Sequence, residues 1–127
     1  MRYTITSTLN ECDKRAIASS VCDIKNFTTD VIMPLVNMSN DKHVHNIFIN
    51  IAINRTNVMC TDLINFLENE DISGMRLLIL EHMISSLVEE YRILDSVLWM
   101  LDSPDVIVSM KKLNKLRDVF CLDHVHN

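Results

Sequence analysis

Histidine and cysteine side chains near the carboxyl end of the sequence have the chemistry of a metal site. Cys121, His124 and His126 lie close together, and thiolate and imidazole groups bind soft divalent metals. His43 and His45 form a second alternating pair. Alternate spacing suits a strand or a tail better than a helix, and a frayed polar tail is the simpler interpretation of the first set. We therefore assign no metal ligand and no cofactor.

Side chains suited to catalysis are present without the motifs that usually position them. The single glycine excludes the common glycine-rich phosphate loops, and no nucleophile-elbow motif surrounds a serine. His82 can transfer protons, but a buried, hydrogen-bonded core histidine is the favoured interpretation. The sequence therefore predicts a binding protein rather than an enzyme.

The composition limits the partners that these side chains can bind. The chain of 127 residues has a formal net charge of −5, and 6% of its residues are aromatic. A nucleic-acid interface needs a basic face and benefits from stacked aromatic rings, so we expect no nucleic acid. The four cysteines form no CxxC pair and no signal peptide is visible. These features indicate a reducing intracellular setting, with thiols used as small core residues.

Apolar periodicity predicts a single all-α domain over residues 1–127. Hydrophobic residues make up 48% of the chain, and one glycine and two prolines leave little material for tight β-turns. We expect residues 1–8 to form an extended lead-in and residues 122–127 a polar tail. Between them, apolar stripes predict six or seven helices around one hydrophobic central helix. The stripes cover residues 9–24, 28–38, 43–54, 56–67, 73–101 and 103–120.

Residues 43–54 fit both a strand and a helix. Isoleucines alternate at Ile47, Ile49, Ile51 and Ile53, which favours a strand, whereas the wider apolar pattern also fits a helical stripe. A lone strand cannot pair its backbone groups and no partner strand is evident, so we predict a helix. Thr56 is then interpreted as the N-cap of the following helix.

The junction between residues 63 and 78 is the most specific feature of the sequence. It joins an amphipathic helix to the most apolar helix across the acidic turn Glu68-Asn69-Glu70-Asp71. Arg76 stands in the first turn of that apolar helix. An arginine beside an apolar core is costly unless it is exposed at a groove or paired. An ordinary exposed arginine at a helix start is the alternative interpretation.

This junction resembles the first homology motif of Bcl-2-type apoptosis regulators. In that motif an amphipathic helix, an acidic residue and the turn N-W-G-R precede the central hydrophobic helix. Gly74-Met75-Arg76-Leu77 is similar to divergent versions encoded by large DNA viruses such as pox- or iridoviruses, and residues 99–105 faintly resemble the second homology motif. The apolar, turn and arginine positions of the first motif fall on Leu63, Leu67, Ile72, Ser73 and Arg76.

The resemblance implies a Bcl-2-like helical bundle that inhibits host apoptosis. Such proteins sequester the BH3 helices of pro-apoptotic proteins, here of the Bim, Bak or Bax type, in a hydrophobic surface groove. Arg76 would pair with the aspartate of the ligand helix. The resemblance also implies a place in the host cytoplasm, with recruitment to mitochondria through partners. The other implied groove residues are Met59, Leu63, Phe66, Leu67, Ser73, Gly74, Leu77, Ile79, Leu80 and Met83.

A second function stays open: a Bcl-2-fold or death-fold helical module that acts on a host innate-immune signalling protein. The death fold lacks a central apolar helix, so the apolar run from Leu77 to Val88 counts against that version. An exposed apolar cleft also invites self-association, so we include a homodimer among the expected states. The apolar run carries several charged side chains, and we expect no membrane-spanning segment.

Overall fold

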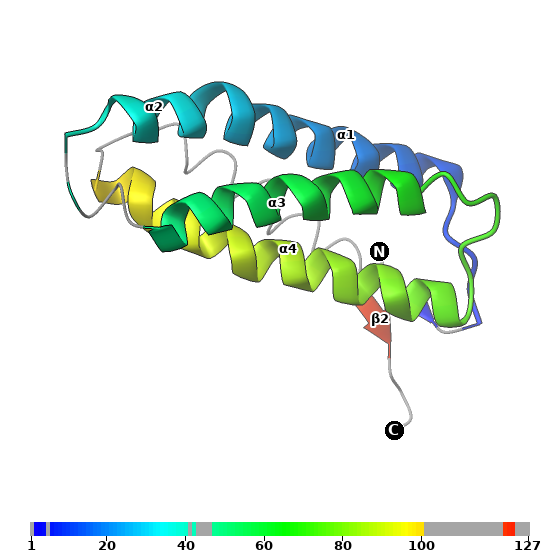
Figure 1. Cartoon of the computed structure of the whole chain (residues 1–127). Coiled ribbons are helices and arrows are strands. Elements are labelled where there is room, and N and C mark those ends of the chain that lie inside the picture. Colours follow the sequence, from blue (N-terminus) through cyan, green and yellow to red (C-terminus); the bar gives the residue numbers. More distant parts are fainter. Residues whose placement is uncertain (1, 5, 41, 43–46, 101–120, 124–127) are drawn as a thin grey trace.

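The computed structural model describes residues 2–4, 6–40, 42, 47–100 and 121–123, and these residues are mostly helical (Figure 1). This confirms the predicted all-α character. Within these residues, no helix has the apolar length that crossing a bilayer requires. The predicted helix 103–120 and both histidine pairs lie outside the described residues. The elements are β1 (Arg2–Thr4), α1 (Glu11–Phe27), η1 (Thr28–Ile32), α2 (Met33–Met38), α3 (Ile47–Phe66), α4 (Met75–Met100) and β2 (Cys121–Asp123).

Helix α1 begins at a capping residue and buries one apolar stripe. Asn10 is the N-cap, and its side-chain oxygen accepts a hydrogen bond from the backbone N–H of Asp13 at 2.7 Å. Ile17, Val21 and Ile24 are buried at successive turns, as the apolar spacing predicts. Helix α1 packs against α3 along this part of the molecule.

The chain continues from α1 into α2 through a wider helical turn, η1, which has π-helical geometry. Pro34 lies in the first turn of α2. It lacks an amide hydrogen, and in a regular α-helix its ring clashes with the carbonyl oxygen four residues earlier. The π-helical turn relieves this conflict because it locally widens the helix without ending it. The buried Thr28 hydroxyl donates to the backbone carbonyl of Ile24 at 2.8 Å, within the same turn.

Helix α3 is one continuous helix where the sequence predicts two. Residues 47–54 are helical, so the prediction of a helix over a strand is confirmed for this part of the segment. Thr56 is buried within α3, and its interpretation as an N-cap is therefore wrong. Asn54 and Arg55 interrupt the apolar pattern because they lie on the exposed side of the helix, not because the helix ends.

The long helices α1, α3 and α4 lie side by side, with α3 between the other two (Figure 1). The sequence predicts that the most apolar helix, now α4, is central, whereas α3 holds the middle position among the described residues. Helix α4 buries one stripe and leaves Ile79 45% exposed. Its buried residues are Leu77, Leu80, Ile84, Leu87, Val88, Tyr91 and Leu94.

A short parallel β-pair joins segments from the two ends of the chain. Strand β1 pairs with β2 in a register that places Tyr3 opposite Leu122. The sequence predicts neither strand as part of a sheet. β1 lies in the expected extended lead-in, and β2 takes up Leu122 and Asp123, which are predicted to belong to the polar tail.

Candidate functional site

The face between α3 and α4 is hollowed by a cleft of about 490 Å³. Two smaller hollows, of about 130 and 360 Å³, both include Met59 and Asp62 and extend it along α3. Lining residues recur every three or four positions on each helix, so each helix contributes one face. We call the combined hollow the α3–α4 groove. Its lining is Asn54, Arg55, Val58, Met59 and Asp62 of α3 and His82, Met83, Ser85, Ser86, Glu89, Glu90 and Ile93 of α4.

The apolar part of the groove is formed by both helices. Met59 and Met83 are half-buried and pack against the core, one from each side. Val58 and Ile93 are 58% and 46% exposed. Thioether side chains are flexible and adapt to different apolar shapes. This lining therefore presents open apolar surface that suits the apolar side chains of a partner.

An ion pair crosses the groove at one end. The Arg55 Nε atom lies 3.0 Å from Glu90 Oε1, and the Glu90 side chain is only 9% exposed. A carboxylate taken this far out of water is costly unless a cation or hydrogen-bond donor compensates it. Arg55 provides that compensation while its own side chain stays 62% exposed. The pair therefore ties α3 to α4 at this end.

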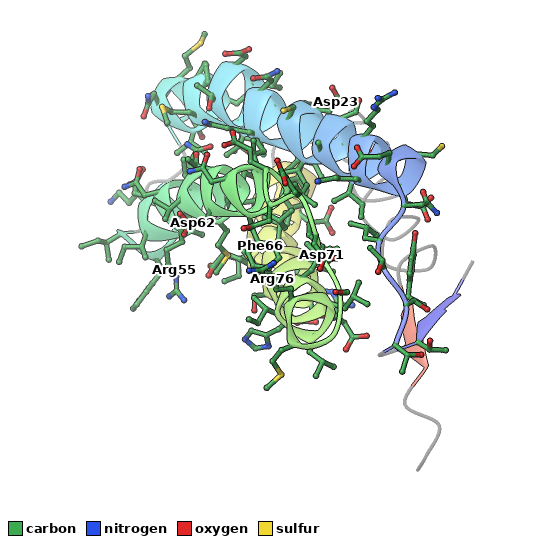
Figure 2. The ribbon with its side chains drawn as sticks, turned by 90° about the vertical axis from the view of Figure 1, so that its right-hand side faces the viewer. Asp23, Arg55, Asp62, Phe66, Asp71 and Arg76 are labelled. Atoms are coloured by element: carbon green, nitrogen blue, oxygen red, sulfur yellow. The ribbon has the colours of Figure 1, made fainter. Side chains whose placement is uncertain are left out.

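Arg76 lies where α3 leads into α4, close to Phe66 and Asp71 in the view of Figure 2. Its Nη1 atom donates to the backbone carbonyl of Asp71 at 2.8 Å, and its side chain is exposed. The ion pairs of the described residues involve Lys14, Arg55 and Arg92, and none involves Arg76. The remaining guanidinium N–H groups are therefore available to donate hydrogen bonds to water or to another molecule.

The turn beneath Arg76 is held by contacts with the start of α1. The Leu9 N–H donates to the carbonyl of Ile72 at 2.9 Å, and Lys14 Nζ donates to the carbonyl of Asn69. Gly74 has a φ of 56°, in the left-handed region that glycine adopts without strain. These contacts fix the backbone from which Arg76 projects.

The structure divides the predicted groove residues into three groups. Met59 and Met83 line the α3–α4 groove. A second group lies near Arg76. Ser73 and Gly74 form the turn before it, Phe66 is half-buried at the end of α3, and Ile79 is exposed on the next turn of α4. The remaining four are core residues with exposed fractions of 0% to 4%, and they do not reach the groove surface: Leu63, Leu67, Leu77 and Leu80.

No protein family, curated protein or solved structure matches this chain. The geometry of the α3–α4 groove and the position of Arg76 are therefore the observations on which a function can be argued.

Several residues of the groove are absent from the sequence-based prediction. Arg55 and Asp62 are two of them, and they recur at four and three residues from the predicted Met59, a helical spacing that marks one face of α3. That spacing could have identified the face, although not the partner of Arg55 on α4. His82 is exposed in the groove, so its interpretation as a buried core histidine is wrong.

Asp62, His82 and Ser86 line the same hollow of about 130 Å³, and these residue types also form catalytic triads. A triad requires hydrogen bonds from nucleophile to base and from base to carboxylate. Among the described residues, no hydrogen bond joins any two of the three side chains. Their arrangement is that of polar side chains along a groove rather than of a proton relay.

Among the described residues, two groups whose pKa values rise to about 12, Tyr3 and Cys60, lie outside the groove. Burial raises the pKa of Cys60 to about 12. Burial, together with the hydrogen bond that Tyr3 donates to Asp13, raises the pKa of Tyr3 to about 12. Both side chains are therefore neutral near pH 7. In the part of the chain that the structure describes, no cluster of three His, Cys, Asp or Glu side chains is placed to hold a metal ion.

Proposed function

We propose that this protein is a viral Bcl-2-like inhibitor of host apoptosis that captures the amphipathic BH3 helix of a pro-apoptotic protein in the α3–α4 groove. One observation carries the proposal: Arg76 is exposed, lacks a carboxylate partner among the described residues, and lies on the α3–α4 side of the molecule (Figure 2). The resemblance of residues 63–78 to the first Bcl-2 homology motif assigns this arginine to the aspartate of the ligand helix.

The length of the groove fits a ligand helix of a few turns. Its lining on α4 runs from His82 to Ile93, 11 residues or about 17 Å along the helix axis, and Arg76 lies six residues before His82. Apolar anchors of the ligand would contact Met59, Met83 and Ile93. Burying one large apolar side chain contributes up to about 1.5–3 kcal/mol.

The four predicted groove residues that lie in the core support the groove rather than contact the ligand. Leu63 and Leu80 are fully buried, one on each of the two helices. They pack in the core from which α3 and α4 present their outer faces. In this proposal they set the spacing of the two groove walls, while the half-buried methionines make the contacts.

Calorimetric titration with Bim, Bak and Bax BH3 peptides tests the proposal. We expect submicromolar binding of at least one peptide. Replacing Arg76 by alanine should weaken that binding about tenfold or more, because the ligand carboxylate would lose its cation in a partly dry site. The matched control is Arg92→Ala: Arg92 is an exposed arginine of the same helix that pairs with Glu89 and does not line the groove.

Two results would count against this function. Absence of binding to every peptide by a folded, monomeric sample overturns it and redirects the search to a host innate-immune signalling protein. An Arg76→Ala variant that loses binding and thermal stability together would show that the arginine is structural. The same proposal places the protein in the host cytoplasm and at mitochondria only through its partners, which localisation in transfected cells would test.

A further inference from the structure

Asp62 lies in a part of the α3–α4 groove that combines methionine side chains with the polar side chains of His82 and Ser86. It lines both smaller hollows together with Met59, and one of them also contains Met83. Asp62 is exposed and has no ion pair or hydrogen bond with another described residue. Arg55 lines one of the same hollows, but its guanidinium is engaged by Glu90 at 3.0 Å.

A ligand that covers the groove removes water from Asp62. His82 and Ser86 line the same hollow but make no hydrogen bond to Asp62, and a carboxylate that loses water without gaining a donor is strongly unfavourable. A bound ligand that brings a cation or a strong hydrogen-bond donor to this point offsets that cost. Arg76 requires the opposite kind of ligand group, an acceptor, because its remaining N–H groups are donors.

Arg76 lies beyond the end of the groove lining, about two to three helical turns from Asp62. Asp62 shares a hollow with His82, Met83 and Ser86, which come six to ten residues after Arg76 on α4. At a rise of about 1.5 Å per residue, the axial separation of Asp62 and Arg76 is roughly 9–15 Å. Figure 2 shows both residues on the α3–α4 side of the molecule.

We propose that Asp62 selects, among amphipathic helices, those with a basic side chain two or three turns away from their acidic residue. This inference rests on the proposed function, because it concerns the ligand of the same groove. Asp62 acts mainly against wrong partners: a helix with an apolar or acidic side chain at that position leaves the carboxylate buried and uncompensated.

A double-mutant cycle between the protein and a Bim BH3 peptide tests this role. Each lysine or arginine of the peptide is replaced in turn by glutamine, and every version is titrated against the wild type and Asp62→Asn. One replacement, about two or three turns from the peptide's acidic residue, should weaken binding to the wild type about tenfold and to Asp62→Asn less than about twofold. Asp30→Asn, which removes an exposed carboxylate of η1 outside the groove, should respond like the wild type.

Charge reversal separates a direct pairing from a structural effect. Asp62→Lys should bind the original peptide more weakly than the wild type, and a glutamate at the identified peptide position should restore affinity. Binding in which every peptide replacement has the same effect on the wild type and Asp62→Asn overturns this inference and leaves the proposed function standing. Absence of binding by every peptide overturns both.

Discussion

Glu90 and Asp62 are carboxylates of the same groove in opposite situations. Glu90 is nearly buried and has Arg55 at 3.0 Å, whereas Asp62 is exposed and unpaired among the described residues. A compensated, buried charge contributes to holding two helices together, and an exposed, unpaired charge is free to meet a partner. The position of a charge relative to the groove therefore separates its structural from its binding role.

Removal of Arg55 should destabilise the fold because it leaves the Glu90 carboxylate buried without its cation. We expect Arg55→Met to lower the free energy of unfolding by about 1–2 kcal/mol, a reduced value for a buried pair because Arg55 itself is largely exposed. Adding Glu90→Gln should recover part of the loss. Urea denaturation followed by circular dichroism measures both changes.

Arg92→Met is the matched control for that substitution. Arg92 lies 3.4 Å from Glu89 on the same helix, and both side chains are more than half exposed. Such surface pairs contribute up to about 0.5 kcal/mol. Equal losses in the free energy of unfolding for the two substitutions would show that the Arg55–Glu90 contact stabilises the fold no more than a surface ion pair.

Individual site residues were predictable where local sequence determines their position. Arg76 follows a turn and begins a helix, so its exposure at the junction follows from the sequence alone. Leu63 and Leu77 share the apolar pattern of groove residues, yet they are fully buried. Which side of an apolar helix faces the core depends on its rotation against its neighbours, and that rotation is a property of packing rather than of local spacing.

At the level of helices, the start of α4 was easier to predict than the continuity of α3. Ser73-Gly74 mark the predicted start of the most apolar helix, and α4 begins at Met75. The break predicted before Thr56 is wrong because a threonine with polar neighbours resembles a cap, although α3 continues through it. Tertiary burial of Thr56 overrides the local preference.

The orientation of α1 and α3 determines which thiols can react. Cys12 and Cys22 are exposed on α1, whereas Cys60 is buried on α3. The sequence predicts thiols as core residues, which is confirmed for Cys60 and wrong for Cys12 and Cys22; the side chain of Cys121 lies outside the described residues. Apolar spacing alone did not distinguish Cys12 from Cys60, because both positions fit a helical stripe.

Thiol labelling checks this orientation. At pH 8, Cys12 and Cys22 should react with iodoacetamide much faster than Cys60, because burial blocks access and raises the pKa of the Cys60 thiol to about 12. Peptide mapping by mass spectrometry assigns each modified cysteine. Denaturation in urea should make the rates alike. Rapid labelling of Cys60 in the folded protein would contradict the placement of α3 against α1.

For the molecule as a whole, the class of fold was predictable, and the pairing of the two strands near the ends of the chain was not. Composition and apolar periodicity indicate an all-α protein, and the described residues confirm it. The pairing of β1 with β2 brings together segments that are more than a hundred residues apart in sequence. Short strands of three residues carry too little local pattern to reveal such a partner.

Alkaline pH should destabilise the whole fold through Tyr3 and Cys60. Their usual pKa values of 10.0 and 9.0 rise to about 12 in the folded protein, so the fold favours the neutral forms. The stability that these two neutral groups contribute is therefore fully present below about pH 9. It falls as the pH rises towards 12, by up to about 1.4 kcal/mol per pH unit for each group.

Urea denaturation between pH 8 and pH 11 measures this loss. Tyr3→Phe should remove part of the dependence above pH 10, and Cys60→Ala should remove part of it from pH 9 upwards. The stability of each variant is compared with its own value at pH 8, because each substitution also changes packing. An unchanged pH profile in both variants would show that other groups control alkaline unfolding.

The parallel direction of β1 and β2 has a mechanical consequence. The chain enters β1 at Arg2 and leaves β2 at Asp123, at opposite ends of the paired strands. A force that pulls these two points apart loads the hydrogen bonds of the pair together, in shear, instead of opening them one after another. When the molecule is stretched by these two points, the hydrogen bonds between β1 and β2 must therefore break before α1 and α4 can separate.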